Sequence, residues 1–134
     1  MNRDDLQELA RIRLNEAKLL LDGSAYDGAY YLAGYAVECA IKSCLARKTR
    51  QYDFPDRETV VKSYTHNLEQ LLDLAGLRQR LADAPPGLKR NWNIVQDWNE
   101  AARYERKSPK DAQDLYGAVA DRDHGVLAWL QRYW

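Results

Sequence analysis

The segment from residue 25 to residue 48 most constrains the fold, because small residues recur throughout an apolar helical pattern. Gly28 and Gly34 interrupt it, and each costs about 1 kcal/mol of helix propensity relative to alanine. Close approach of neighbouring helices would offset that cost, so we predict that this segment is the central helix of a bundle. Its apolar stripe comprises Tyr26, Ala29, Tyr30, Ala33, Val37, Ala40, Ile41, Cys44 and Leu45.

The rest of the chain also carries helical periodicity, with apolar residues recurring three and four positions apart. Residues 49–64 are the exception, because they lose this period and contain Pro55, which predicts a long loop. Residues 1–134 therefore predict a single all-α domain, an up-and-down bundle of four to five helices. The main predicted helices cover residues 4–21, 25–48, 66–76 and 88–102, and a last one runs from residue 109 to near the C-terminus. A short additional helix is predicted over residues 77–83.

Capping residues mark several of the predicted helix ends. Gly23 is suited to end the first helix in the left-handed conformation, and Gly76 ends the helix that Thr65 opens as N-cap. Ser108 followed by Pro109 is an efficient start signal, with serine as the N-cap and proline at the first helical position. These residues set the predicted helix boundaries.

The chain carries 20 basic and 20 acidic residues, so its formal net charge is zero. Such a balance argues against a broad electrostatic surface for nucleic acid or for an anionic membrane. The charge is nevertheless uneven along the chain, because residues 42–62 and 86–110 each carry 6 basic and 3 acidic residues. A small, local phosphate site therefore remains compatible with the sequence.

The first residues of the chain are charged and show no apolar core of a secretory signal. No apolar run approaches the roughly 18 residues of a membrane span. Cys39 and Cys44 are five positions apart on the central helix, which turns their side chains about 140° from each other and disfavours a disulfide between them. We therefore expect a cytoplasmic chain with two buried, reduced thiols and no membrane partner.

Motifs for the commonest catalytic chemistries are missing from the sequence. It contains no glycine-rich phosphate loop, no CxxC pair, no HExxH and no GxSxG, and it predicts no cofactor. A metal site can be imagined from an acidic series, but a solvated acidic face is the favoured interpretation, so no metal is predicted. That series comprises Asp111, Asp114, Asp121 and Asp123.

Two candidate functional features lie on the central helix and on the helix after residue 65. Glu38 and Lys42 are spaced to form an i,i+4 ion pair, either at the surface or as a buried pair that lines a polar pocket. His66 is expected in the first turn of its helix. It is interpreted either as a cap or local hydrogen-bond partner, or as a residue for proton transfer or phosphate contact.

The third candidate is the basic segment before the last helix. Its arginines, Arg103 and Arg106, are suited to bidentate phosphate contacts. Tyr104 or a nearby tryptophan is suited to stacking on a base. The alternative is that this segment, which also contains Lys107, is a solvated basic connector.

Three segments of the sequence together resemble the HEPN domain (higher eukaryotes and prokaryotes nucleotide-binding). Residues 25–42 read AYDGAYYLAGYAVECAIK, which resembles the small-residue helix of that family with its "AvE…K" ending. Residues 65–68 read THNL before a leucine-rich helix, and Arg103-Tyr104 resembles the family's "RY" element. The order and spacing of all three segments agree, and the resemblance spans about residues 6–132.

The resemblance implies a helical bundle that commonly dimerises. It also implies a function with nucleotides or RNA, in many members beside a minimal nucleotidyltransferase in toxin–antitoxin or nucleotide-handling modules. Other members are metal-independent ribonucleases that use an Arg-x4–6-His motif. This sequence lacks that motif, because no histidine follows an arginine at the required spacing, and His124 follows Arg122 too closely.

Three functional hypotheses follow. The leading one is a non-catalytic HEPN-like module that binds a nucleotide or an RNA phosphate, or a nucleotidyltransferase partner, through a cleft near Glu38, Lys42, His66, Arg103 and Tyr104. The second is a ribonuclease toxin in which His66 replaces the missing histidine and Arg103 or Arg106 clamps the phosphate. The third is a purely structural partner subunit.

A homodimer is also predicted, from an aromatic cluster at the end of the chain. Trp129, Tyr133 and Trp134 are more apolar than the end of a terminal helix usually is, and exposed patches of this kind mark interfaces. The competing interpretation is that these rings cover the end of the bundle.

Overall fold

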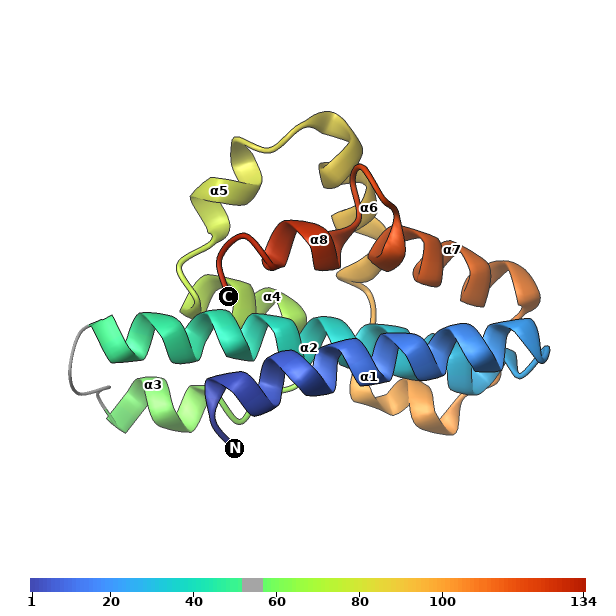
Figure 1. The fold of residues 1–134 in the computed structure, drawn as a ribbon, viewed down its shortest axis with the longest axis horizontal. Coiled ribbons are helices and arrows are strands. Elements are labelled where there is room, and N and C mark those ends of the chain that lie inside the picture. The colour runs from blue at the N-terminus through green and yellow to red at the C-terminus, as the bar shows by residue number, and fades with distance from the viewer. Residues whose placement is uncertain (52–56) are drawn as a thin grey trace.

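A computed structural model describes residues 1–51 and 57–134, and every regular element in these ranges is helical. Long helices α1 (Arg3–Asp22) and α2 (Tyr26–Gln51) form an antiparallel hairpin (Figure 1). The shorter elements are α3 (Arg57–Lys62), α4 (Leu68–Leu74), α5 (Arg78–Ala82), α6 (Pro86–Val95), the 3₁₀ helix η1 (Glu100–Tyr104), α7 (Pro109–Ala120) and α8 (Val126–Leu130). The predicted all-α fold class is confirmed.

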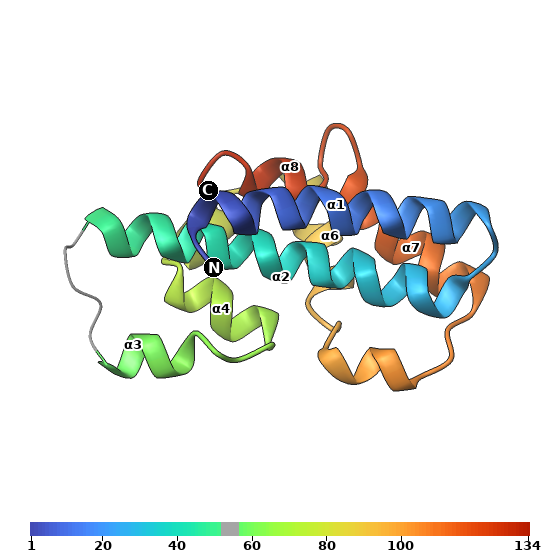
Figure 2. The ribbon, with the colours of Figure 1, turned by 60° about the horizontal axis from the view of Figure 1, so that its bottom comes forward.

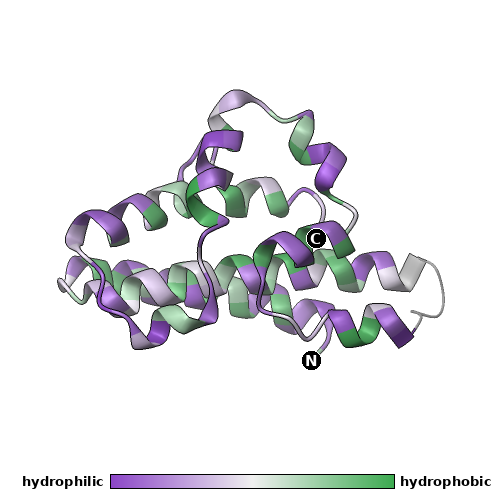
Figure 3. Cartoon of the chain, turned by 180° about the vertical axis from the view of Figure 1, so that it is seen from behind, coloured by the Kyte–Doolittle hydropathy of each residue, from purple (hydrophilic) through white to green (hydrophobic). Residues whose placement is uncertain are grey.

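Helix α2 is the centre of the molecule, as its small residues predict. It packs against α1 along its length, and α4, η1, α7 and α8 also contact it. Figure 2 shows α3 and η1 on one side of the α1–α2 hairpin, with α7, α8 and the C-terminus on the other. Figure 3 shows that hydrophobic residues are concentrated along α2, whereas in the outer helices hydrophobic positions alternate with polar ones.

The glycines of α2 permit close helix contacts. A Cβ atom on Gly34 would overlap the indole of Trp98, and one on Gly28 would lie 3.0 Å from a methyl carbon of Leu20 on α1. Trp98 is 2% exposed, and its ring stacks on that of Tyr31 with centroids 6.0 Å apart. The propensity lost at these glycines is thus offset by packing against α2.

Several predicted caps are confirmed and others are wrong. Ser108 is the N-cap of α7 in a capping box with Asp111, and Gly76 ends α4 with φ +74°. Gly23 is not left-handed, because its φ is −88°; the residue with positive φ at this turn is Ser24, at 61°. Thr65 is not the N-cap of α4 either, because Asn67 accepts the backbone hydrogen bond from Gln70.

The chain is divided more finely than the periodicity predicts. The predicted loop over residues 49–64 is partly wrong, because α2 continues to Gln51 and α3 covers Arg57–Lys62; residues 52–56 lie outside the described part. The predicted helix over residues 88–102 is two elements, α6 and η1, since the chain leaves the helix to place Trp98 against Gly34. The predicted last helix is also two, α7 and α8, joined by a tight turn at residues 121–125.

The C-terminal aromatic cluster covers the end of the fold. Trp129 is 6% exposed and Trp134 is 8% exposed, so neither forms an apolar surface patch. Tyr133 contacts Trp129 edge-on, at 5.6 Å between centroids, and the guanidinium of Arg11 lies 4.8 Å from the centre of the Trp134 ring. The prediction that these rings are exposed as an interface is therefore wrong, and the alternative that they cover the bundle is correct.

Candidate functional site

Glu38 is a buried carboxylate on the central helix. Its side chain is 3% exposed, although glutamate is almost never fully buried unless it is paired. Oε2 of Glu38 lies 3.5 Å from Nζ of Lys42, one turn along α2, and Oε1 lies 2.8 Å from Nδ1 of His66. The predicted pair of Glu38 and Lys42 is therefore the buried version, and a histidine completes it.

His66 connects three segments that are far apart in the sequence. It lies in the connection before α4, two residues ahead of Leu68, and not inside the first helical turn as predicted. Besides its contact to Glu38, its Nε2 lies 3.2 Å from Oε2 of Glu100, the first residue of η1. We call Lys42, Glu38, His66 and Glu100 the polar chain, because successive members contact one another.

The polar chain can hold the His66 ring in a defined orientation. A carboxylate accepts hydrogen bonds only, so Nδ1 of His66 donates to the buried Glu38. This leaves Nε2 directed to the half-exposed Glu100, on the solvent side. Carboxylates on both ring nitrogens hold the imidazole in one position, which a general acid–base or a ligand-binding histidine requires.

Arg103 and Tyr104 lie on η1, the element that Glu100 begins. Both side chains are exposed, Tyr104 to 81%, and the guanidinium of Arg103 lies 5.0 Å from the centre of the Tyr104 ring. η1 contacts α2, and the side chain of Asn99 caps its start. The segment is thus anchored at one end to the polar chain, while Arg103 and Tyr104 present a cation and an aromatic ring to solvent.

The rest of the basic segment lies at a different place. Arg106 and Lys107 line a small cavity of about 330 Å³ beside the α1–α2 turn. The backbone of Lys107 donates to Asp27 at 2.5 Å, and its ammonium lies 2.9 Å from Glu105 and 4.4 Å from the centre of the Tyr30 ring. The structure therefore brings Glu38, Lys42 and His66 together, places Arg103 and Tyr104 on the adjoining element, and puts Arg106 at a separate cavity.

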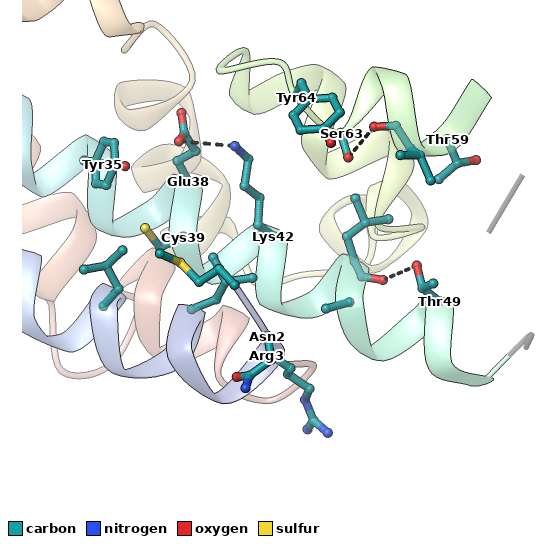
Figure 4. Close-up of a pocket in the computed structure, with 16 residues that line it drawn as sticks. Asn2, Arg3, Tyr35, Glu38, Cys39, Lys42, Thr49, Thr59, Ser63 and Tyr64 are labelled. Carbon is teal, nitrogen blue, oxygen red and sulfur yellow. Dashed lines mark hydrogen bonds and ion pairs between the residues drawn. The ribbon is translucent and has the colours of Figure 1, made fainter. Parts of the chain in front are cut away.

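A cavity of about 580 Å³ borders the polar chain, between the start of α1, the middle of α2 and the region of α3. Figure 4 shows Glu38 and Lys42 directed toward each other on α2, with Tyr64 across the opening. Among the described residues, the Lys42 ammonium contacts only Glu38, at 3.5 Å, so it retains hydrogen-bond donors for a ligand. Burial raises the pKa of the Tyr35 hydroxyl on the same wall, with Cys39 and Glu38 adding to the shift.

Glu100 and Trp98 are the members of this region that the sequence reasoning missed. The sequence pattern predicts a continuous helix over residues 88–102, which contains both residues. The sequence does contain a signal for a new helical element here. Asn99, a residue type common at N-caps, lies between Trp98 and Glu100, shortly before Arg103-Tyr104. Only the folded chain shows that Glu100 reaches His66.

The acidic series near the last helix is divided among separate local contacts. Asp111 belongs to the capping box of α7, Asp114 pairs with Lys110, and Asp121 accepts from the backbone of His124. Within residues 1–51 and 57–134, no three or more histidine, cysteine or acidic side chains are grouped as metal ligands would be. No described helix combines the length and apolarity needed to cross a membrane.

The comparisons with known proteins agree with the sequence resemblance. The family model for the HEPN domain matches residues 4–131, nearly the whole chain. Searches of curated proteins and of solved structures find no match. Because the family model covers far more than half of the sequence, and because the fold is all-α, the chain belongs to the HEPN domain family.

Proposed function

We propose that this chain is a HEPN module that binds a nucleotide or an RNA phosphate at the polar chain. The observation that carries the proposal is the convergence of three sequence segments. Glu38 and Lys42 come from α2, His66 from the connection before α4, and Glu100 from the element that also carries Arg103. Membership of the family supports a function with nucleotides or RNA.

The proposed ligand contacts follow from the charges that the structure leaves available. Lys42 supplies an ammonium at the cavity, and Arg103 supplies a guanidinium that makes no ion pair in the described part of the chain. Arginine suits phosphate because its planar group donates two parallel hydrogen bonds. Tyr104 beside it offers an exposed ring on which a base can stack.

The test is a titration of nucleotides and of single-stranded RNA into the protein, followed by tryptophan fluorescence. We expect Arg103→Ala to weaken binding about tenfold or more, the loss expected for a charged hydrogen bond. Arg90→Ala is the control, because Arg90 is exposed on α6 and no described residue pairs with it. Absence of binding at millimolar concentration, or equal binding by Arg103→Ala, refutes the proposal.

A second candidate function is metal-independent RNA cleavage. The observation that favours it is the 2.8 Å contact between buried Glu38 and His66, an arrangement suited to general acid–base catalysis. His66 would then take the role of the missing motif histidine, with Arg103 holding the phosphate, because Arg106 lies at a separate cavity. The purified protein should cleave RNA in the presence of a metal chelator, and its induced expression should arrest cell growth. His66→Ala should abolish both effects. Failure of the wild-type protein to do either contradicts this function.

Partners belong to the same proposal. Co-purification with a minimal nucleotidyltransferase encoded nearby would support the structural-subunit hypothesis and a toxin–antitoxin-type system. HEPN domains often form dimers, and a homodimer is therefore also proposed here. Its candidate surface is α1, where Ile12 is 43% exposed and Leu19 is 65% exposed, rather than the buried C-terminal aromatics.

A further inference from the structure

A second cavity, of about 520 Å³, is lined by four basic residues. It lies between the last turns of α2, the turn from α4 to α5, and the residues after α8. Among the described residues that line it, none is acidic, although the chain as a whole balances its charges. The four basic residues are Arg47, Lys48, Arg80 and Arg132. We call it the basic cavity.

Two of the four cations have no partner within the described part of the chain. Lys48 donates to the carbonyl of Leu74 at 3.2 Å, and the guanidinium of Arg80 lies 5.3 Å from the centre of the Tyr133 ring. Arg47 and Arg132 make no ion pair or side-chain hydrogen bond to any described residue. The cavity therefore holds donors that the fold itself does not use.

The acidic side chains of the adjoining helix α4 are already engaged. Glu69 and Asp73, on α4, both pair with Arg78, at 2.5 Å and 2.7 Å respectively. A cleft lined by one sign of charge concentrates the potential inside it and raises the local concentration of counter-ions. The electrostatics of the basic cavity thus favour an anionic ligand.

The size and lining of the cavity narrow the class of anion. Its volume lies within the range of about 300–1,000 Å³ that holds small organic ligands, and it has room for more than one anionic group. Arginine is the residue best suited to phosphate oxygens, and three of the four cations are arginines. We propose that the basic cavity binds the linked phosphate groups of a nucleotide or of an oligonucleotide backbone.

This site is separate from the polar chain. Among the described residues, none lines both the basic cavity and the cavity beside Glu38 and Lys42. It borders α5 and the C-terminus, which Figure 1 shows on the side of α2 opposite to α3. The inference therefore does not depend on the function proposed above, and variants can test the two sites independently.

The test is isothermal titration calorimetry with inorganic tripolyphosphate, adenosine triphosphate and a short single-stranded RNA oligonucleotide. We expect at least one of these probes to bind, and Arg47→Gln/Arg132→Gln to weaken it by roughly a hundredfold, about tenfold for each charged hydrogen bond. The control is Lys89→Gln/Arg90→Gln, which removes two exposed, unpaired charges from α6 instead. Unchanged binding by Arg47→Gln/Arg132→Gln would assign the signal to another site and overturn the inference.

The probes distinguish the two sources of phosphate. Binding of tripolyphosphate and the nucleotide supports a free nucleotide as the ligand, whereas binding of RNA alone supports a backbone segment. For RNA, the slope of affinity against salt should fall by about 1 for each arginine removed. If no probe binds at millimolar concentration, or if the control weakens binding as much as the double arginine variant, the inference is wrong. Both arginines are exposed at the cavity, so their replacement should leave the fold intact. A thermal unfolding curve that matches that of the wild-type protein checks this.

Discussion

The indole of Trp98 occupies the space where a side chain on Gly34 would begin. A Cβ atom at position 34 would overlap Cδ1 and Nε1 of the ring, and the ring itself is 2% exposed. Trp98 stands two residues before Glu100, which begins η1 and reaches His66. The absence of a side chain at Gly34 thus sets how closely the segment that carries Arg103 and Tyr104 can approach the central helix.

Gly34→Ala should therefore destabilise the protein, although alanine is the better helix former. The rigid, buried indole cannot yield to a new methyl group, and such overpacking costs about 1–3 kcal/mol. Gly117→Ala in α7 is the matched control, because a Cβ there meets no atom within 4 Å. It should stabilise by roughly 0.5–1 kcal/mol through helix propensity. Urea denaturation measures the free energy of unfolding of both variants. An equal change in the two variants would contradict the packing argument.

Trp92 and Trp98, two of the four buried tryptophans, should respond differently to replacement by phenylalanine. Trp92 and Trp98 are both 2% exposed, but Nε1 of Trp92 donates to Oε1 of Glu69 at 2.8 Å, whereas Nε1 of Trp98 has no partner among the described residues. Trp92→Phe loses a hydrogen bond to a charged group and Trp98→Phe loses none. We expect Trp92→Phe to lower the free energy of unfolding by about 1 kcal/mol more.

Chemical denaturation at neutral pH measures this difference directly. Both substitutions remove the same ring volume, so the cavity contribution is similar in the two variants. If Trp98→Phe is the more destabilising of the pair, its indole N–H makes an interaction that the geometry does not show.

The elements that were predicted correctly depend on neighbours in the sequence. The small-residue stripe of α2 and the Ser108 N-cap of α7 act over three or four positions, so a local pattern is sufficient. The end of α6 was missed because Trp92, Val95 and Trp98 continue a helical period, while the chain leaves the helix to place Trp98 on Gly34. That contact joins residues far apart in the sequence, so no local pattern contains it.

The polar chain shows the same limit. The i,i+4 spacing of Glu38 and Lys42 predicted their pairing, but the spacing cannot tell a surface pair from a buried one. The contacts of His66 to Glu38 and to Glu100 span 28 and 34 positions, and they exist only because α4 and η1 both pack on α2. The candidate residues were thus predictable by type, and their connection was not.

Alkaline pH should destabilise the fold through the two cysteines. Burial raises the pKa of Cys39 from an ordinary 9.0 to about 11, with Glu38 adding to the shift. Burial raises that of Cys44 from 9.0 to about 12, and its thiol lies 3.6 Å from the Leu130 carbonyl oxygen. Above pH 9 the unfolded chain has lost these protons while the folded chain retains them, so the free energy of unfolding falls as the pH rises.

The expected slope is about 1.4 kcal/mol per pH unit for each thiol. It applies from pH 9 to about 11 for Cys39 and to about 12 for Cys44. Thermal unfolding of the wild-type protein and of Cys39→Ala/Cys44→Ala across this range tests the prediction. The tyrosines titrate in both proteins, so the difference between the two curves isolates the cysteines. Parallel curves would show that the thiols do not contribute.

The last prediction concerns the homodimer. Ile12 and Leu19 are seven positions apart on α1, so they lie on one face of that helix, and both remain exposed in the single chain. If this face is the dimer surface, a glutamate at position 19 places a charge in an apolar interface that offers it no partner.

Leu19→Glu should therefore convert a dimer, of twice the 15.5 kDa chain mass, into the monomer. Ile94→Glu is the matched control, because Ile94 is 42% exposed on α6 and away from this face. Size-exclusion chromatography with light scattering measures both masses. If the wild-type protein elutes as a single 15.5 kDa species, the prediction of a dimer is wrong. If only Ile94→Glu dissociates the dimer, the interface lies on α6 instead. A glutamate at position 19 is then tolerated because that position faces water in the assembled protein.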